Sequence, residues 1–105
     1  MKPSDAMLKG FGMAGGEQCT CAYFRGDHRK PDSVCAVASI WLGADGDANQ
    51  IHAPKHPLVA LAESVFEEII GHPVRMEDIN NGSVTGQHGP MSIPDIAGIL
   101  AAEGY

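Results

Sequence analysis

The chain has little positive charge, few cysteines and no long apolar run. Its 105 residues include seven basic and thirteen acidic side chains, for a formal charge of −6 at pH 7. Because basic side chains supply most of the affinity for phosphate, this balance argues against nucleic acid as a partner. No stretch approaches the roughly 18 consecutive apolar residues of a transmembrane helix, so no membrane association is expected.

Three cysteines are an odd number, and the N-terminal stretch lacks the apolar centre of an export signal. We therefore expect reduced thiols in a cytoplasmic protein. A hydrophobic content of 44% and a charged content of 19% are those of an ordinary folded domain. Residues 1–105 are thus predicted to form one small globular domain.

The fold predicted from the sequence is all-α, with about four helices. The clearest one repeats apolar side chains along one helical face, beginning at Pro57 and ending before Gly71. A second is apolar on every side, which predicts a buried helix, with a short buried strand as the competing interpretation. The last is capped by Ser92. The four predicted helices cover residues 4–14, 34–43, 57–70 and 92–103.

The predicted core is centred on the 34–43 helix. Aromatic and branched side chains elsewhere in the chain are expected to pack against it, namely Tyr23, Phe24, Trp41, Phe66 and Ile96. On the 57–70 helix, three acidic side chains are expected to face solvent, namely Glu63, Glu67 and Glu68. The interior glycine of the last helix, Gly98, is explained if another backbone packs closely against it.

Two long loops, 44–56 and 80–91, connect the predicted helices. The first contains acidic residues from Asp45 to Asn49 that imitate the opening of a calcium-binding loop. It lacks the glycine and the final bidentate acid of that motif, so a polar turn is favoured. The second is rich in turn-forming residues around Asn81 and Gly82. Long loops in small domains are often functional, which makes 80–91 a candidate binding region.

One candidate site is a zinc site with three cysteines and one histidine, a ligand set that suits a tetrahedral ion. The candidate ligands are Cys19, Cys21, His28 and Cys35. Structural zinc sites usually place two to four residues between the first two cysteines, whereas a single residue separates Cys19 from Cys21. The spacing therefore favours free thiols, and no cofactor is expected.

A second candidate site has Cys35 as a nucleophile. The start of a helix lowers the pKa of a thiol and supplies N–H groups that stabilise an oxyanion. A histidine base and an orienting amide would have to be brought close by the fold, and His88 and Asn80 are the candidates for these roles. The other available residues are His52, His56, His72 and Asn81. Packing of Cys35 as a small core side chain is the competing interpretation.

Three short motifs resemble a family of small bacterial proteins with no assigned function. They are Cys-Thr-Cys-Ala-Tyr at 19–23, Val-Cys-Ala-Val-Ala at 34–38 and Ile-Asn-Asn at 79–81, before a capped C-terminal helix. The family has Cys-x-Gly-Ala-Tyr, Val-Cys-Ala-Leu-Gly-Ala and Asn-Asp at these points. Here Cys21 replaces a glycine, Ala38 and Ser39 replace the glycine and alanine, and Asn81 replaces an aspartate.

The resemblance spans most of the chain from residue 19 to residue 100. It implies a bacterial source and draws attention to Cys19, Tyr23, Cys35 and Asn80, and it implies no activity. If it holds, Cys21 and His28 are incidental, which further weakens the zinc hypothesis.

The function predicted from the sequence is non-enzymatic. We expect a cytoplasmic binding or regulatory protein that acts through a protein surface or a small pocket beside the 80–91 loop. An enzyme with Cys35 as nucleophile and a small zinc-binding domain are the alternatives. Self-association as a homodimer is a further expectation, with apolar side chains of the N-terminal helix at the interface, namely Met7, Phe11 and Met13.

Overall fold

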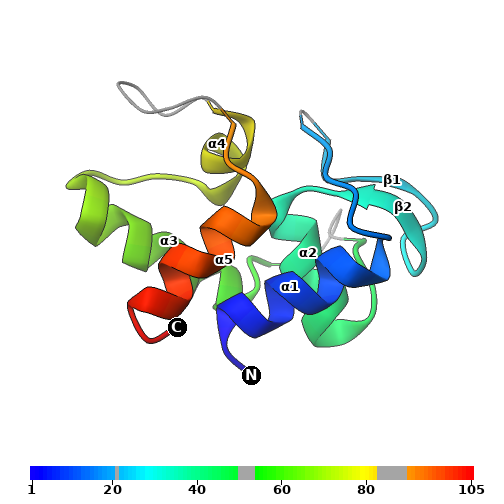
Figure 1. Cartoon of the computed structure of the whole chain (residues 1–105), viewed down its shortest axis with the longest axis horizontal. Helices are drawn as coiled ribbons and strands as arrows, with labels where there is room; N and C mark the ends of the chain where they lie inside the picture. The colour runs from blue at the N-terminus through cyan, green and yellow to red at the C-terminus, as the bar shows by residue number, and fades with distance from the viewer. Residues whose placement is uncertain (21, 50–53, 83–89) are drawn as a thin grey trace.

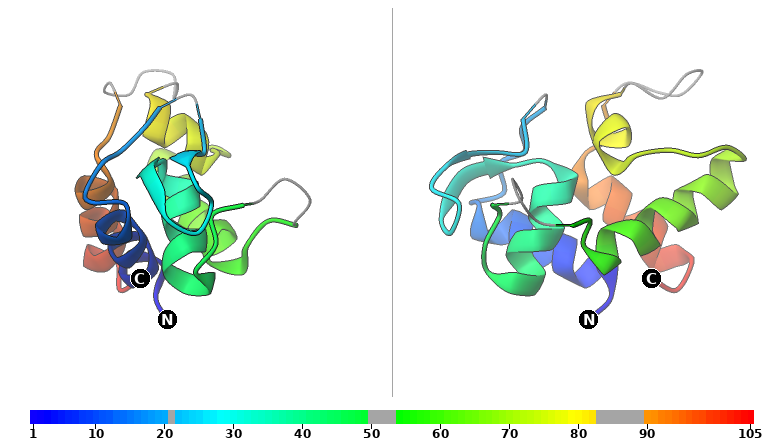
Figure 2. Two further views of the ribbon diagram at one scale, coloured as in Figure 1. Left: turned by 90° about the vertical axis from the view of Figure 1, so that its right-hand side faces the viewer. Right: turned by 180° about the vertical axis from the view of Figure 1, so that it is seen from behind.

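Five helices and a two-stranded antiparallel sheet make up the part of the chain that the structure describes (Figure 1). The computed structural model describes residues 1–20, 22–49, 54–82 and 90–105. In chain order the elements are α1 (Pro3–Met13), β1 (Phe24–Gly26), β2 (Pro31–Val34), α2 (Ala36–Asp45), α3 (Pro57–Ile70), α4 (Met76–Asn81) and α5 (Ile93–Ala102). The hairpin and α3 lie at opposite ends of the molecule (Figure 2).

The four predicted helices are confirmed, and their ends agree with the prediction to within about two residues. The prediction of an all-α fold is correct only in part, because it lacks the hairpin and α4. Val34, the first residue of the predicted 34–43 helix, belongs to β2 instead. The side chain that caps α2 is that of Cys35, whose Sγ accepts the Ala38 N–H at 3.4 Å.

The hairpin pairs Phe24 with Val34 and shifts register between Arg25 and Gly26. Gly26 has φ of 88°, a left-handed conformation that glycine adopts without a steric penalty. Val34 also bonds the segment before the hairpin: its carbonyl accepts the Cys19 N–H at 3.0 Å. The hairpin therefore fixes the path of the chain on both sides of residue 21.

Helices α1 and α2 pack with their backbones in direct contact. A Cβ atom added to Gly10 would lie 1.9 Å from the Ser39 carbonyl oxygen, and one added to Gly43 would lie 1.8 Å from the Ala6 carbonyl oxygen. No real Cβ atom approaches that closely, so both positions require glycine. Glycine inside a helix lowers its intrinsic stability, and at Gly10 it is required because the backbone of α2 packs directly against it.

The core lies between α1, α2 and α5, with one side closed by α3 and α4. Its largest fully buried side chains include Met7, Ile40, Leu42, Met76, Ile93, Ile96 and Leu100. Phe66 and Ile96 are buried as predicted, and Phe24 and Trp41 are partly buried against the core. Tyr23 is not a core residue, because 47% of it is exposed. Met7 is fully buried and is unavailable for the predicted dimer interface.

One acidic side chain of α3 is buried, contrary to the prediction. Glu63 is 4% exposed, and its two carboxylate oxygens accept bonds from Lys55 Nζ at 2.6 Å and from the Met76 N–H at 2.8 Å. On the same helix, the apolar side chains of Leu61 and Ile69 are exposed. The buried face of α3 therefore includes Glu63 and leaves out Leu61 and Ile69. Glu63 bonds the first turn of α4 from this face.

Gly98 has no atom of another segment within 4 Å of an added Cβ, so the close packing expected there is absent from the described residues. None of the helices in the described ranges is long and apolar enough to cross a membrane.

The glycines give a prediction about stability. Gly10→Ala and Gly43→Ala should each destabilise the protein by about 1–3 kcal/mol, because α1 and α2 would have to separate. Gly98→Ala, on an exposed helical surface, should instead stabilise it by up to about 1 kcal/mol. Urea denaturation followed by circular dichroism measures all three. Equal effects at the three positions would contradict the close contact between the helices.

Candidate functional site

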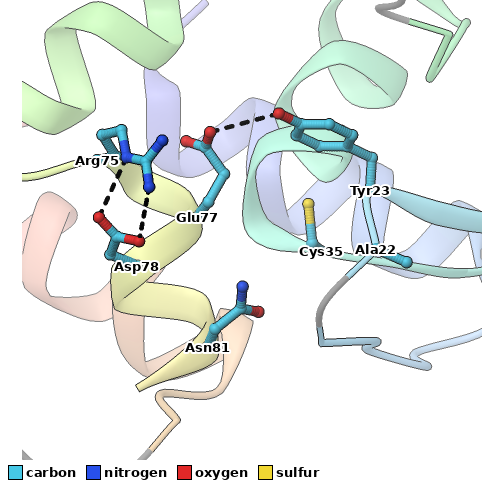
Figure 3. Close-up of a pocket in the computed structure, with 7 residues that line it drawn as sticks. All are labelled: Ala22, Tyr23, Cys35, Arg75, Glu77, Asp78 and Asn81. Carbon is cyan, nitrogen blue, oxygen red and sulfur yellow. Dashed lines mark hydrogen bonds and ion pairs between the residues drawn. The ribbon is translucent and has the colours of Figure 1, made fainter. Parts of the chain in front are cut away.

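A pocket of about 330 Å³ opens between α4 and the segment that leads into β1 and α2. Ala22, Tyr23 and Cys35 line one side, and residues of the α4 region line the other, namely Arg75, Glu77, Asp78 and Asn81 (Figure 3). We call it the α4 pocket. Asn81, the last residue of α4, lines the pocket. The pocket therefore lies beside the start of the 80–91 region, which was predicted to be a candidate binding region.

Helix α4 is only six residues long, and contacts from other elements hold it in place. At its start, the Met76 N–H is bonded by Glu63 of α3. At its end, Gly82 takes the left-handed conformation with φ of 75°. Between these ends, Met76 and Ile79 are buried one turn apart, which turns Glu77 and Asp78 toward the pocket side.

The pocket carries three charged side chains. Arg75 donates to both carboxylate oxygens of Asp78, each at 3.2 Å, so these two charges offset each other. Glu77 accepts a hydrogen bond from the Tyr23 hydroxyl at 3.3 Å across the pocket. Partial burial and the nearby Glu77 carboxylate raise the pKa of Tyr23, which stays protonated at neutral pH.

Cys35 lies at the base of the pocket and is only 3% exposed. Burial raises its pKa to about 12, although N–H groups at the start of α2 act in the opposite direction. The helix start alone would lower this pKa, but desolvation of the thiolate outweighs the N–H donors, so the expected lowering is not found. The thiol is therefore neutral at pH 7 and acts as a small apolar surface.

Asn80 is fully buried and does not act as the orienting amide of a histidine among the described residues. Its Oδ1 accepts the Ala36 N–H at 2.9 Å, and its Nδ2 donates to the Cys19 carbonyl at 3.0 Å. Asn80 Nδ2 also donates to Asn81 Oδ1 at 3.0 Å. A single side chain of α4 thus bonds both the start of α2 and the segment before the hairpin.

Gln18 extends this amide network to α5. Its Nε2 donates to Asn80 Oδ1 and to the Met91 carbonyl, both at 2.8 Å. Its Oε1 accepts the Ile93 N–H at 2.7 Å, which satisfies a donor in the first turn of α5. The Gln18–Asn80 pair therefore joins segments that are 62 residues apart in the sequence.

Of the candidate histidine bases, the two that the structure describes, His56 and His72, do not line the pocket at Cys35. His88 and His52 lie outside the described residues. His56 accepts the Leu58 N–H through Nδ1 at 3.0 Å and bonds Asp45 through Nε2 at 3.1 Å, so it caps α3. Its ring packs edge-on against Trp41, with centroids 4.7 Å apart. His72 is exposed and bonds the neighbouring Pro73 carbonyl.

The candidate zinc ligands do not form one cluster among the residues that the structure describes. Cys19 and Cys35 are buried free thiols. His28 lies on the hairpin loop, where its Nδ1 is 2.7 Å from Asp47 Oδ1. Cys21 lies outside the described residues. Across the described ranges, no three histidine, cysteine or acidic side chains gather as a metal would require.

The charged side of the pocket, which belongs to the α4 region, was not predicted from the sequence. Arg75, Glu77 and Asp78 were left without a role, although their segment contains the signals of a short helix. Acidic residues follow Met76, Ile79 lies one turn later, and Gly82 ends the run. Tyr23 was predicted to lie in the core, although tyrosine is intermediate in burial, and it lines the pocket instead.

No protein-family model matches the sequence, and no curated protein and no solved structure matches the chain. The assignment of function therefore rests on the geometry of the α4 pocket.

The amide network gives a prediction about coupling. Asn80→Ala should destabilise the protein by about 3 kcal/mol, because it leaves the buried Ala36 N–H and Cys19 carbonyl without a partner. Gln18→Ala should lower the free energy of unfolding by less than Asn80→Ala does, since Gln18 is partly exposed. The destabilisation of the double variant should be about 1 kcal/mol smaller than the sum of the two single destabilisations. A urea double-mutant cycle measures this coupling, and strictly additive effects would show that the two amides act independently.

The raised pKa of Cys35 gives a prediction about reactivity. A thiol with a pKa of about 12 holds about a thousandfold less thiolate at pH 8 than one with a pKa near 9. Iodoacetamide should therefore modify Cys35 in the native protein at least that much more slowly than glutathione. Mass spectrometry of digested samples gives the rate at each cysteine, with urea-unfolded protein as the control. Complete alkylation of native Cys35 within minutes would restore the nucleophile hypothesis.

Proposed function

We propose that this chain is a non-enzymatic binding protein that recognises a partner protein through the α4 pocket. The observation that carries the proposal is the position of Tyr23, which is 47% exposed at the edge of a pocket whose base is the neutral thiol of Cys35. Exposed tyrosines at the edge of small pockets are typical of protein interfaces, because the ring supplies contact area at low entropic cost.

The chemistry of the pocket supports binding over catalysis. A thiolate nucleophile needs a lowered pKa and a base within hydrogen-bond reach. In the described structure the pKa of Cys35 is raised, and the backbone N–H of Cys35 is bonded to the Tyr23 carbonyl at 2.8 Å. That bond fixes Tyr23 relative to α2, so that the pocket has a rigid wall on the side opposite α4.

A displayed random-peptide library tests this proposal. Peptides selected on the native protein should bind the α4 pocket, and Tyr23→Ala should weaken them at least about tenfold, as expected for a central aromatic contact. Leu8→Ala is the matched control, because Leu8 is also 47% exposed but lies on α1, outside the pocket.

Titration of labelled protein with the selected peptides locates the site by NMR. Chemical shift changes should concentrate at the amides of Tyr23, Cys35 and Glu77. Changes concentrated on α1, or equal losses in the Tyr23 and Leu8 variants, would show that the partner binds elsewhere.

A further inference from the structure

The charges of the α4 pocket do not balance. Among the described residues that line it, Arg75 is the one basic side chain, and both oxygens of Asp78 already bind it. Glu77 is hydrogen-bonded in the pocket by the uncharged Tyr23 hydroxyl, at a long 3.3 Å, and Arg75 interacts with it electrostatically without a hydrogen bond. The charged side chains that line the pocket, one basic and two acidic, thus sum to one negative charge beside an aromatic ring (Figure 3).

We infer that the α4 pocket receives a lysine or arginine side chain from a basic segment of a partner protein. This inference rests on the proposed function and specifies its ligand. The aliphatic stem of such a side chain packs along the Tyr23 ring and the neutral Cys35 thiol, and its cationic end reaches the Glu77 carboxylate. An aromatic face beside a carboxylate suits a cation through both the ring quadrupole and direct charge pairing.

Two further observations favour a basic partner. The chain has a formal charge of −6, which attracts a basic segment and speeds its encounter with the protein. The pocket volume of about 330 Å³ is at the lower end for small-molecule sites, which span roughly 300–1,000 Å³. A single extended side chain needs less room than a whole ligand, because the rest of the peptide lies on the surface outside.

Short peptides with one central residue test the inference. The probes are acetylated, amidated pentapeptides with lysine, arginine, norleucine, citrulline or glutamate between glycines, titrated into labelled protein by NMR. The lysine and arginine peptides should bind at the amides of Tyr23, Glu77 and Asp78. Norleucine and citrulline have nearly the same shape without the charge, and should bind at least about fivefold more weakly.

Variants of the pocket separate charge from shape. Glu77→Gln should weaken the lysine peptide about fivefold and leave the norleucine peptide unchanged. Glu103→Gln is the matched control, because it removes the same charge from an exposed position after α5, outside the pocket. Tyr23→Phe keeps the ring and should retain binding, whereas Tyr23→Leu should weaken the lysine peptide about threefold to fivefold. Added salt should reduce the preference for lysine.

The outcomes distinguish this inference from the proposed function. Equal or tighter binding of the glutamate or norleucine peptide in the pocket would overturn the basic ligand, while the pocket would remain a binding site. Butylamine that binds as tightly as the lysine peptide would overturn the assignment to a partner protein. If none of the five peptides perturbs the pocket amides, the inference is wrong, and the library selection then decides the proposed function on its own.

Discussion

The structure depends on one buried side chain, that of Asn80. Its amide satisfies the first N–H of α2 and the Cys19 carbonyl, two groups that no regular secondary structure would pair. Through Gln18 it also reaches the first turn of α5. Buried polar groups of this kind are costly unless they are bonded, so the network permits essentially one relative placement of α2, α4 and α5. The apolar core supplies stability, and the network specifies the arrangement.

The network also explains why Cys35 is a poor nucleophile. A thiol at a helix N-terminus gains reactivity when it is exposed to the N–H groups and to substrate. Here the first N–H of α2 is bonded to Asn80, and the thiol itself accepts the Ala38 N–H while the core covers it. The N–H groups at the start of α2 could stabilise an anion in an active site. Here the Ala36 N–H instead bonds Asn80 and so joins α2 to α4. What remains accessible beside Cys35 is the ring of Tyr23.

The sequence predicted what depends on local patterns. The four longer helices follow from periodic apolar residues and from caps such as Ser92 and Pro57, and each was found. The hairpin was missed because strands of three and four residues are too short to show an alternating pattern. The burial of Glu63 and the exposure of Tyr23 were missed because both depend on contacts distant in sequence, with Met76 and Glu77 respectively. The sequence therefore pointed to only one side of the candidate site, that of Cys35. It gave no indication of the α4 side, with Arg75, Glu77 and Asp78.

Helix α4 shows why that opposite side is built from polar contacts. A six-residue helix cannot be stable alone, because its few hydrogen bonds do not offset the entropy of nucleation. Glu63 holds its first N–H and Asn80 holds its last turn against α2, so a carboxylate and an amide fix it at both ends. Buried Met76 and Ile79 would tolerate rotation of so short a helix, whereas directional hydrogen bonds do not. The same bonds that orient α4 therefore bring Glu77 to face Tyr23, so buried polar groups outside the pocket set its shape.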